Sequence, residues 1–243
     1  ESLKKKLAEG VALFVWVNPN SPTGLHVSKP DVEAVLRESS TCKRVWIDET
    51  YIEYAGLEHS MESFATKSEN VIVCKSMSKV YALSGLRAAY LCASPHQLEE
   101  LKVITPPWSV SLPAQIAATY ALHANDYYAL RYRETKELRE KLVQELSAMG
   151  IKEIIPGVAN FVMFHLPKTM DTAESIVKTC RDRGLFLRNV AGMGSEVGRR
   201  AMRMAVKDEE TNNRMLDIFR NALNQANSIP RKDEIHEPIF TSY

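Results

Sequence analysis

The sequence lacks the features that mark metal-binding, nucleic-acid-binding and membrane proteins. Its cysteines, Cys42, Cys74, Cys92 and Cys180, are scattered without the spacing of a metal site or a disulfide framework, and the six histidines show no ligand spacing. The 31 lysines and arginines nearly balance 30 aspartates and glutamates, so the formal charge of +1 gives no basic excess for nucleic acid or membrane surfaces. No apolar run approaches the roughly 20 residues of a membrane-spanning helix. These absences, together with an apolar share of 45%, predict an ordinary cytoplasmic globular protein with reduced thiols.

Apolar runs alternate with helical stretches along the first half of the chain. Strands are expected at residues 11–17, 44–48 and 71–75, separated by helices at about 28–40 and 60–68. This alternation is typical of a mostly parallel sheet with crossover helices on both faces. A further strand at 87–92 and helices near 95–103 and 112–124 complete an α/β domain, which we predict to span residues 1–126.

The second half begins with a long charged helix at about 127–149, which Gly150 ends. After it, strands are expected near 151–155, 160–165, 184–188 and 201–206, with helices near 172–182 and 208–226. This order predicts a smaller α+β domain over residues 127–228. Residues 229–243 contain proline and charge with little periodicity, which favours an extended tail.

A lysine turn follows the third expected strand. Ser76-Met77-Ser78-Lys79 comes directly after the expected strand 71–75, and Arg87 lies eight residues beyond the lysine. A lysine at a strand end, with hydroxyls and a guanidinium nearby, suits a covalent aldehyde cofactor that carries a phosphate. The amine forms the Schiff base, and the other groups bind the phosphate oxygens. Taken alone, the motif is more typical of a solvated surface lysine in a polar turn.

Polar residues at two other strand ends favour the ligand-binding interpretation. The turn 18–24, with the sequence NPNSPTG, follows the first strand, and its two prolines and glycine make it rigid. Open α/β sheets bind ligands at this edge, although the turn alone fits a structural role about as well. Asp48 ends the second strand, where an acid requires a cation or hydrogen-bond donors. A helix cap or a salt bridge would also explain it.

Taken together and in this order, the three elements resemble the fold-type I, class I/II aminotransferase superfamily, whose enzymes depend on pyridoxal 5′-phosphate (PLP). The likeness covers about residues 1–226 and is greatest to the branch of histidinol-phosphate aminotransferase and threonine-phosphate decarboxylase. The resemblance implies that Lys79 forms the Schiff base and moves the substrate's proton, while Asp48 keeps the pyridine nitrogen protonated. It implies that Tyr51 donates to the cofactor's phenolic oxygen. It further implies a phosphate site made of Ser76, Ser78 and Arg87.

The resemblance also indicates how the substrate and the cofactor's phenolic oxygen are held. Arg203, inside the strand-like run 201–206, matches the family's arginine that pairs with the substrate α-carboxylate, although an arginine on an exposed edge strand is the alternative. Arg188 is a candidate for a second anionic group. Where the family has an asparagine before the proline of the turn, this chain has Ser21, with Asn20 one step earlier. Either Asn20 or Ser21 is expected to contact the cofactor.

Three functions remain open at this point. The first is transamination between an amino acid, phosphorylated or not, and a 2-oxo acid. The second is a decarboxylase or other lyase acting on a phosphorylated amino acid, which requires the same lysine, aspartate and tyrosine. The third is a non-catalytic scaffold of the same fold.

Relatives in the resembled family carry a long segment before the proline-rich turn, which supplies sheet strands and a phosphate cradle. The present chain reaches that turn within its first 25 residues. We therefore expect residues 1–243 alone to be poorly soluble unless a complementing N-terminal segment or a partner subunit covers the open sheet edge. By resemblance, a homodimer is the default assembly.

Overall fold

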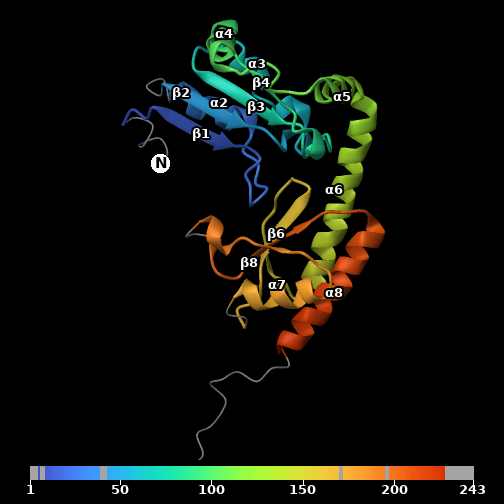
Figure 1. Ribbon diagram of the computed structural model, residues 1–243. Helices are drawn as coiled ribbons and strands as arrows, with labels where there is room; N and C mark the ends of the chain where they lie inside the picture. Colours follow the sequence, from blue (N-terminus) through green and yellow to red (C-terminus); the bar gives the residue numbers. More distant parts are fainter. Residues whose placement is uncertain (1–4, 6–8, 39–42, 170–171, 195–196, 228–243) are drawn as a thin grey trace, which may run out of the picture.

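The computed structural model describes residues 5, 9–38, 43–169, 172–194 and 197–227. Over these residues the chain forms two four-stranded sheets, each with its own helices (Figure 1). A long helix, α6 (Asn125–Ala148), runs along one side of the molecule from the first sheet to the second. The predicted tail, 229–243, lies outside the described residues.

The first sheet has the order β1-β2-β3-β4 and consists of β1 (Leu13–Val17), β2 (Arg44–Asp48), β3 (Val71–Ser76) and β4 (Ala89–Cys92). The first three strands are parallel, and β4 is antiparallel to β3. The register pairs Val17 with Asp48 and Asp48 with Cys74, so the carboxyl ends of the parallel strands meet at one edge. The predicted strand at 44–48 is confirmed. The turns after all three strands lie together at that edge.

Helices α2 (Lys29–Glu38) and α3 (Glu62–Ala65) cover one face of this sheet. Alternate strand residues such as Val45 and Ile47 point into the same core as Val32, as the two-residue period of a strand requires. On β1 the opposite face is open among the described residues, with Leu13 58% and Val15 54% exposed. The sheet therefore keeps an apolar edge strand that is covered on one face only.

Three short 3₁₀ helices and two further α-helices complete the first half. The 3₁₀ helices are η1 (Ile52–Tyr54), η2 (Leu57–His59) and η3 (Ser84–Leu86), and the α-helices are α4 (Pro95–Ile104) and α5 (Leu112–His123) before α6. The helices expected near 95–103 and 112–124 are confirmed. The helix expected at 60–68 is reduced to the single turn of α3, because the chain first winds through η1 and η2. The strand expected from residue 87 begins only at Ala89, since Arg87 has a left-handed backbone with φ of 55°.

The second sheet is antiparallel, with the order β5-β6-β8-β7. Its strands are β5 (Glu153–Ile154), β6 (Phe161–His165), β7 (Arg188–Asn189) and β8 (Ala201–Ala205). Helices α7 (Ala173–Asp182) and α8 (Glu209–Asn227) pack with α6 on one face, and η4 (Ala191–Met193) follows β7. Gly150, at φ of 87°, follows α6 as predicted.

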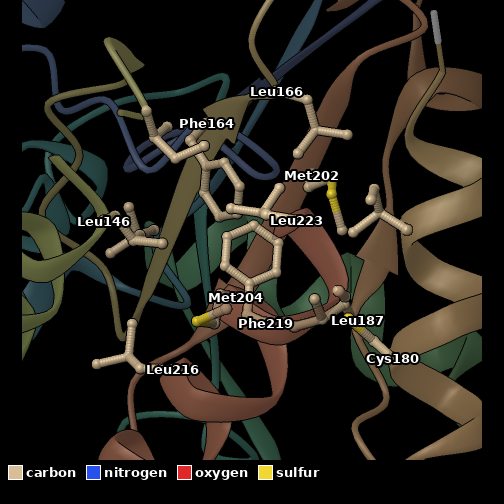
Figure 2. Close-up of a cluster of buried hydrophobic side chains, with 14 of the residues drawn as sticks. Leu146, Phe164, Leu166, Cys180, Leu187, Met202, Met204, Leu216, Phe219 and Leu223 are labelled. Atoms are coloured by element: carbon tan, nitrogen blue, oxygen red, sulfur yellow. The ribbon is translucent and has the colours of Figure 1, made fainter. Parts of the chain in front are cut away.

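A continuous apolar core joins the second sheet to its helices, and Figure 2 shows Phe164 and Phe219 at its centre with Met202, Met204 and Leu223 around them. The rings of Phe164 and Phe219 meet edge to face at 5.6 Å. Because strand side chains alternate, the neighbours of these core residues point to the opposite face. Phe161 and Arg203 are thereby directed away from the helices.

Two strand predictions in this half were wrong in their bounds. The strand expected at 184–188 pairs only at Arg188 and Asn189. Gly184, at φ of 82°, ends α7, and the next residues, Leu185 and Leu187, fill the core without a neighbouring strand. The strand expected at 151–155 pairs only over β5, because Ile151 is still bonded to the end of α6. Apolar alternation alone does not distinguish such core-facing loops from strands.

The two sheets meet through a close backbone contact between the proline-rich turn and the segment before β6. Val158 N–H donates to Gly24 O at 2.8 Å. A Cβ placed on Gly157 would lie 2.7 Å from Thr23 O and 2.9 Å from Gly24 Cα, so only glycine fits. The division at residues 126 and 127 stays a prediction, but this contact fixes where the two halves touch.

Candidate functional site

Asp48 lies at the carboxyl end of β2, half-buried and with its two oxygens in different roles. Its Oδ1 accepts hydrogen bonds from the Thr50 N–H at 2.9 Å and from the Thr50 hydroxyl. Among the described residues, no donor is bonded to Oδ2. Asp48 therefore stabilises its own turn, as the capping alternative expected, and retains one oxygen for another donor.

The proline-rich turn after β1 is held by its own side chains. Asn18 is buried, and its amide group both donates to Val27 O and accepts from Val27 N–H, each at 2.9 Å. Asn20 Oδ1 accepts from the Thr23 hydroxyl at 2.8 Å, so it serves the turn itself. The Ser21 hydroxyl instead accepts from Arg203 Nη1 at 3.3 Å. Each of the two candidates left open by the sequence keeps a donor group that these bonds do not use, so the choice between Asn20 and Ser21 stays a prediction.

Tyr51, Phe161 and Arg203 form a layered contact between the two sheets. The rings of Tyr51 and Phe161 meet edge to face at 5.4 Å, and the Arg203 guanidinium carbon lies 4.5 Å from the centre of the Phe161 ring. Burial raises the pKa of Tyr51, an effect that Arg203 opposes and Asp48 reinforces. Tyr51 thus lies within electrostatic reach of Asp48 and Arg203, two other residues of the predicted site. Sequence reasoning missed Phe161, whose role depends on a contact between distant segments.

Arg188 and Arg203 face each other across the antiparallel pair of β7 and β8. Directly opposed side chains lie on the same face of a sheet, and like charges there repel. Burial lowers the pKa of Arg203, the charge of Tyr51 opposes this, and the charge of Arg188 lowers it further. Two guanidinium groups held together in this way form a site suited to an anion.

The lysine turn has a rigid base and an exposed tip. Met77 is buried and its N–H donates to Ala88 O at 3.1 Å, while the hydroxyls of Ser76 and Ser78 lie 2.8 Å apart. Lys79 is exposed, and Arg87 donates to Ser84 O at 2.9 Å within its own loop. The two serine hydroxyls are hydrogen-bonded to each other. Among the described residues, no hydrogen bond or ion pair connects Lys79 or Arg87 with Asp48 or Arg203.

A buried lysine that the sequence analysis did not single out lies four residues before Lys79. Lys75 is 1% exposed, and its Nζ lies 3.3, 3.5 and 3.7 Å from carboxylate oxygens of Glu53, Glu62 and Glu49. Burial raises the pKa of Glu49 and of Glu53, and the charge of Lys75 opposes the rise in both. The sequence did contain a signal for this cluster, namely a lysine at the end of an apolar run and two glutamates, Glu49 and Glu53, four residues apart.

The sequence and the fold both match known proteins. The model of the family described as aminotransferase class I and II matches residues 1–219. The chain belongs to this family. A relative named histidinol-phosphate aminotransferase, from Methylobacillus flagellatus, is 30% identical over 193 residues, which cover 79% of this chain and 51% of that protein.

Two solved structures show the same fold. The histidinol-phosphate aminotransferase of Sinorhizobium meliloti, solved in complex with pyridoxal-5′-phosphate, has a TM-score of 0.82 at 23% identity, covering 92% of this chain and 60% of that one. The L-threonine-O-3-phosphate decarboxylase of Porphyromonas gingivalis has a TM-score of 0.75 at 19% identity, covering 90% and 65%.

The chain spans about half the length of the first curated relatives it matches. The predicted fold class, with its PLP-transferase-like large domain, is confirmed. In the part of the chain that the structure describes, no helix combines the length and apolar character needed to cross a membrane. Among the described residues, no group of three or more histidine, cysteine, aspartate or glutamate side chains is placed to hold a metal ion.

Proposed function

We propose that the protein is a PLP-dependent aminotransferase acting on an amino acid that carries a second anionic group. The observation that carries this proposal is that Tyr51 and Arg203, from the two halves of the chain, both contact the Phe161 ring, with Asp48 within electrostatic reach of Tyr51. The family membership and the relatives' names support the reaction class. A PLP complex of one structural neighbour supports the cofactor.

The residues present suit PLP in their donor and acceptor chemistry. The Asp48 oxygen that Thr50 does not use is an acceptor for a protonated pyridine nitrogen. The adjacent hydroxyls of Ser76 and Ser78, with the Arg87 guanidinium, supply donors for a phosphate. Tyr51, together with Asn20 or Ser21, would donate to the phenolic oxygen. When bound, PLP serves as the electron sink for bond breaking at the substrate α-carbon.

The chain's own groups would divide the remaining work between binding and proton transfer. Lys79 would be the residue that holds the cofactor through its aldehyde, and its Nζ amine, when free, would take the proton from the substrate α-carbon. Lys79 is exposed in the part of the chain that the structure describes, so its amine is accessible both to a cofactor aldehyde and to a substrate. A base at this atom is required in transamination.

Arg203 is proposed to bind the substrate α-carboxylate, since its guanidinium stacks on Phe161 and presents a fixed fork. Arg188, directly opposite on β7, would bind a second anion such as a phosphate on the substrate side chain. Repulsion between the two arginines is relieved when anions bind, which favours doubly anionic substrates over simple ones.

A decarboxylase of a phosphorylated amino acid remains the second candidate, because the paired arginines suit such a substrate equally well. The two reactions differ in which bond to the α-carbon is broken. Amino exchange that depends on a 2-oxo acid supports transamination, whereas release of carbon dioxide without amino exchange supports the decarboxylase.

Assembly is proposed from the exposed apolar surfaces of the first half. Leu112, Ile116 and Tyr120 follow a four-residue spacing on α5, and all three are exposed. Such a stripe suits a homodimer contact.

A groove of about 510 Å³ along β1, lined by Val15, Trp16 and Leu25, suits a complementing N-terminal segment. Cytoplasmic location is proposed with this assembly.

The test is reconstitution of the chain with PLP, together with the complementing N-terminal segment where solubility requires it. We expect a visible absorbance band that borohydride bleaches, and amino exchange with a 2-oxo acid. Lys79→Ala should abolish the absorbance band and the amino exchange. Lys67→Ala, which replaces an exposed lysine elsewhere, should retain both. A reconstituted protein that stays colourless would support the scaffold alternative and contradict the proposal.

A further inference from the structure

A second pocket lies beside the buried lysine cluster and is not used by the proposed reaction. It has a volume of about 370 Å³ and is formed by η1 and η2, by the turn after Lys79 and by the start of α6. Its walls include the acids Glu53, Glu58 and Asp126 and the tyrosines Tyr81, Tyr128 and Tyr132. None of the residues lining it is a lysine, arginine or histidine. We call it the tyrosine pocket.

Two buried polar atoms of residues that line this pocket have no hydrogen-bond partner among the described residues. They are Glu53 Oε2 and Tyr132 Oη. Burial and the nearby Glu53 carboxylate raise the pKa of Tyr81, whose hydroxyl is therefore the protein group closest to serving as a donor to Glu53. Glu53 is only 5% exposed, and its other oxygen, Oε1, accepts from Lys75 Nζ at 3.3 Å. A buried carboxylate oxygen without a hydrogen-bond donor lowers the stability of the folded protein. A ligand that donates a hydrogen bond to it would recover this free energy on binding.

The charges around Glu53 are also unbalanced. Lys75 is shared by Glu49, Glu53 and Glu62, so one positive charge faces three carboxyl groups within 4 Å. Burial raises the pKa of Glu53, which indicates that the folded protein binds a proton there more readily than the unfolded chain does. A cation in the pocket compensates the same excess of negative charge without a proton.

The tyrosines supply aromatic surface around this position. The rings of Tyr81 and Tyr128 meet at 5.0 Å with an interplanar angle of 75°, and Tyr128 and Tyr132 stack at 6.1 Å. The Tyr128 hydroxyl already donates to Tyr81 O, so its ring is fixed in place. Walls of electron-rich rings combined with a carboxylate are the features that recognise organic ammonium ions.

We propose that the tyrosine pocket binds the ammonium group of a small organic amine. The ammonium N–H groups donate to Glu53 Oε2 and Tyr132 Oη, the rings of Tyr81 and Tyr128 lie beside the alkyl chain, and Asp126 attracts the cation at the exposed rim. A bare metal ion is disfavoured, because no group of three metal-ligating side chains exists in the described part of the chain. The volume also suits a small molecule better than a single ion.

The experiment is calorimetric titration of the PLP-free Lys79→Ala protein at constant KCl, with the complementing N-terminal segment where solubility requires it, so that neither the aldehyde nor the amine of the proposed catalytic site contributes. The probes are ethylammonium, tetramethylammonium and ethanol. We expect saturable binding of ethylammonium, weaker binding of tetramethylammonium, which has no N–H donor, and none of ethanol. Amine binding measured in this way tests the tyrosine pocket alone, so its failure can be distinguished from failure of the proposed aminotransferase function.

Variants separate the pocket from the rest of the surface. Tyr132→Phe removes one hydroxyl and is expected to weaken ethylammonium binding about fivefold, and Glu53→Gln about tenfold or more. The matched control, Tyr120→Phe on the exposed face of α5, should bind as the parent does. Because Glu53→Gln also disturbs the Lys75 cluster, Asp126→Asn at the rim provides an independent loss of about threefold. Absence of saturable binding, equal binding of ethanol, displacement by equimolar KCl, or unchanged affinity in Tyr132→Phe and Asp126→Asn would each overturn the proposal.

Discussion

Arg203 on β8 donates to the Ser21 hydroxyl in the turn after β1 at 3.3 Å, across 182 positions of sequence. This bond joins the second sheet to the edge of the first where the carboxyl ends of its parallel strands lie. The same guanidinium stacks on Phe161, which in turn contacts Tyr51. A substrate carboxylate bound by Arg203 would therefore lie beside the residues proposed to hold the cofactor.

Arg203→Lys tests the proposed role in substrate binding. A lysine keeps the charge but loses the planar fork and the stacking on Phe161, so kcat/KM for the amino-acid substrate should fall by about tenfold or more. The measurement is steady-state kinetics of the reconstituted enzyme. Arg199→Lys, an exposed arginine on the same connection, is the control. Equal kinetics in both variants would remove Arg203 from the substrate site.

Phe161→Ala should destabilise the protein by about 3–5 kcal/mol, because a buried ring is lost together with its contacts to Tyr51 and Arg203. The matched control is Phe186→Ala, whose ring is 76% exposed and whose loss should cost less than about 0.5 kcal/mol. Denaturant unfolding measures both. Similar losses in the two variants would mean that Phe161 does not join the sheets.

Gly157→Ala tests the contact between the two halves. The added Cβ would lie within 3.0 Å of three backbone atoms of Thr23 and Gly24, which cannot move aside like a flexible side chain. We expect a loss of about 1–3 kcal/mol in the free energy of unfolding. Gly192→Ala is the control, since its Cβ meets nothing within 4 Å. A neutral Gly157→Ala would show that the turn and β6 are not in close contact.

Lys75→Met should be strongly destabilising, by about 3–5 kcal/mol at neutral pH, because it leaves buried carboxylates without their cation. The loss should depend on pH with a definite sign. Burial raises the pKa values of Glu49 and Glu53 above 4.5 in the folded protein, so the protonated carboxyl groups favour folding at low pH, and this favourable effect is lost as pH rises through the folded values.

Removal of Lys75 raises those pKa values further and extends the sensitive range upward. The difference between the variant and the parent should therefore be smaller at pH 5 than at pH 8. Lys152→Met, which replaces an exposed lysine, should show no such widening. A destabilisation of Lys75→Met that stays constant between pH 5 and pH 8 would contradict the charge argument.

Local patterns predicted the fold well where the chain alternates regularly. The strand at 44–48 and the helices at 95–103 and 112–124 agree closely with the structure, since each has its own period and boundary residues. The strand at 184–188 was misplaced because core-facing loop residues imitate strand alternation. Boundary errors such as the late start of β4 follow from the left-handed backbone at Arg87, which sequence does not announce.

The candidate site was predictable only as far as its parts lie at strand ends. Asp48, Lys79 and the proline-rich turn are marked by their position after apolar runs. The choice between Asn20 and Ser21 depends on which side chain the turn uses for itself, and the roles of Phe161 and Lys75 depend on contacts across many residues. Those contacts are properties of the packed structure.

The most direct test is to reduce the PLP-loaded protein with borohydride, digest it and locate the modified residue by mass spectrometry. The account predicts one pyridoxyl adduct on Lys79, absent from Lys79→Ala and retained in Lys75→Arg. An adduct on another lysine, or no adduct in a folded protein that carries a complementing N-terminal segment, would contradict it.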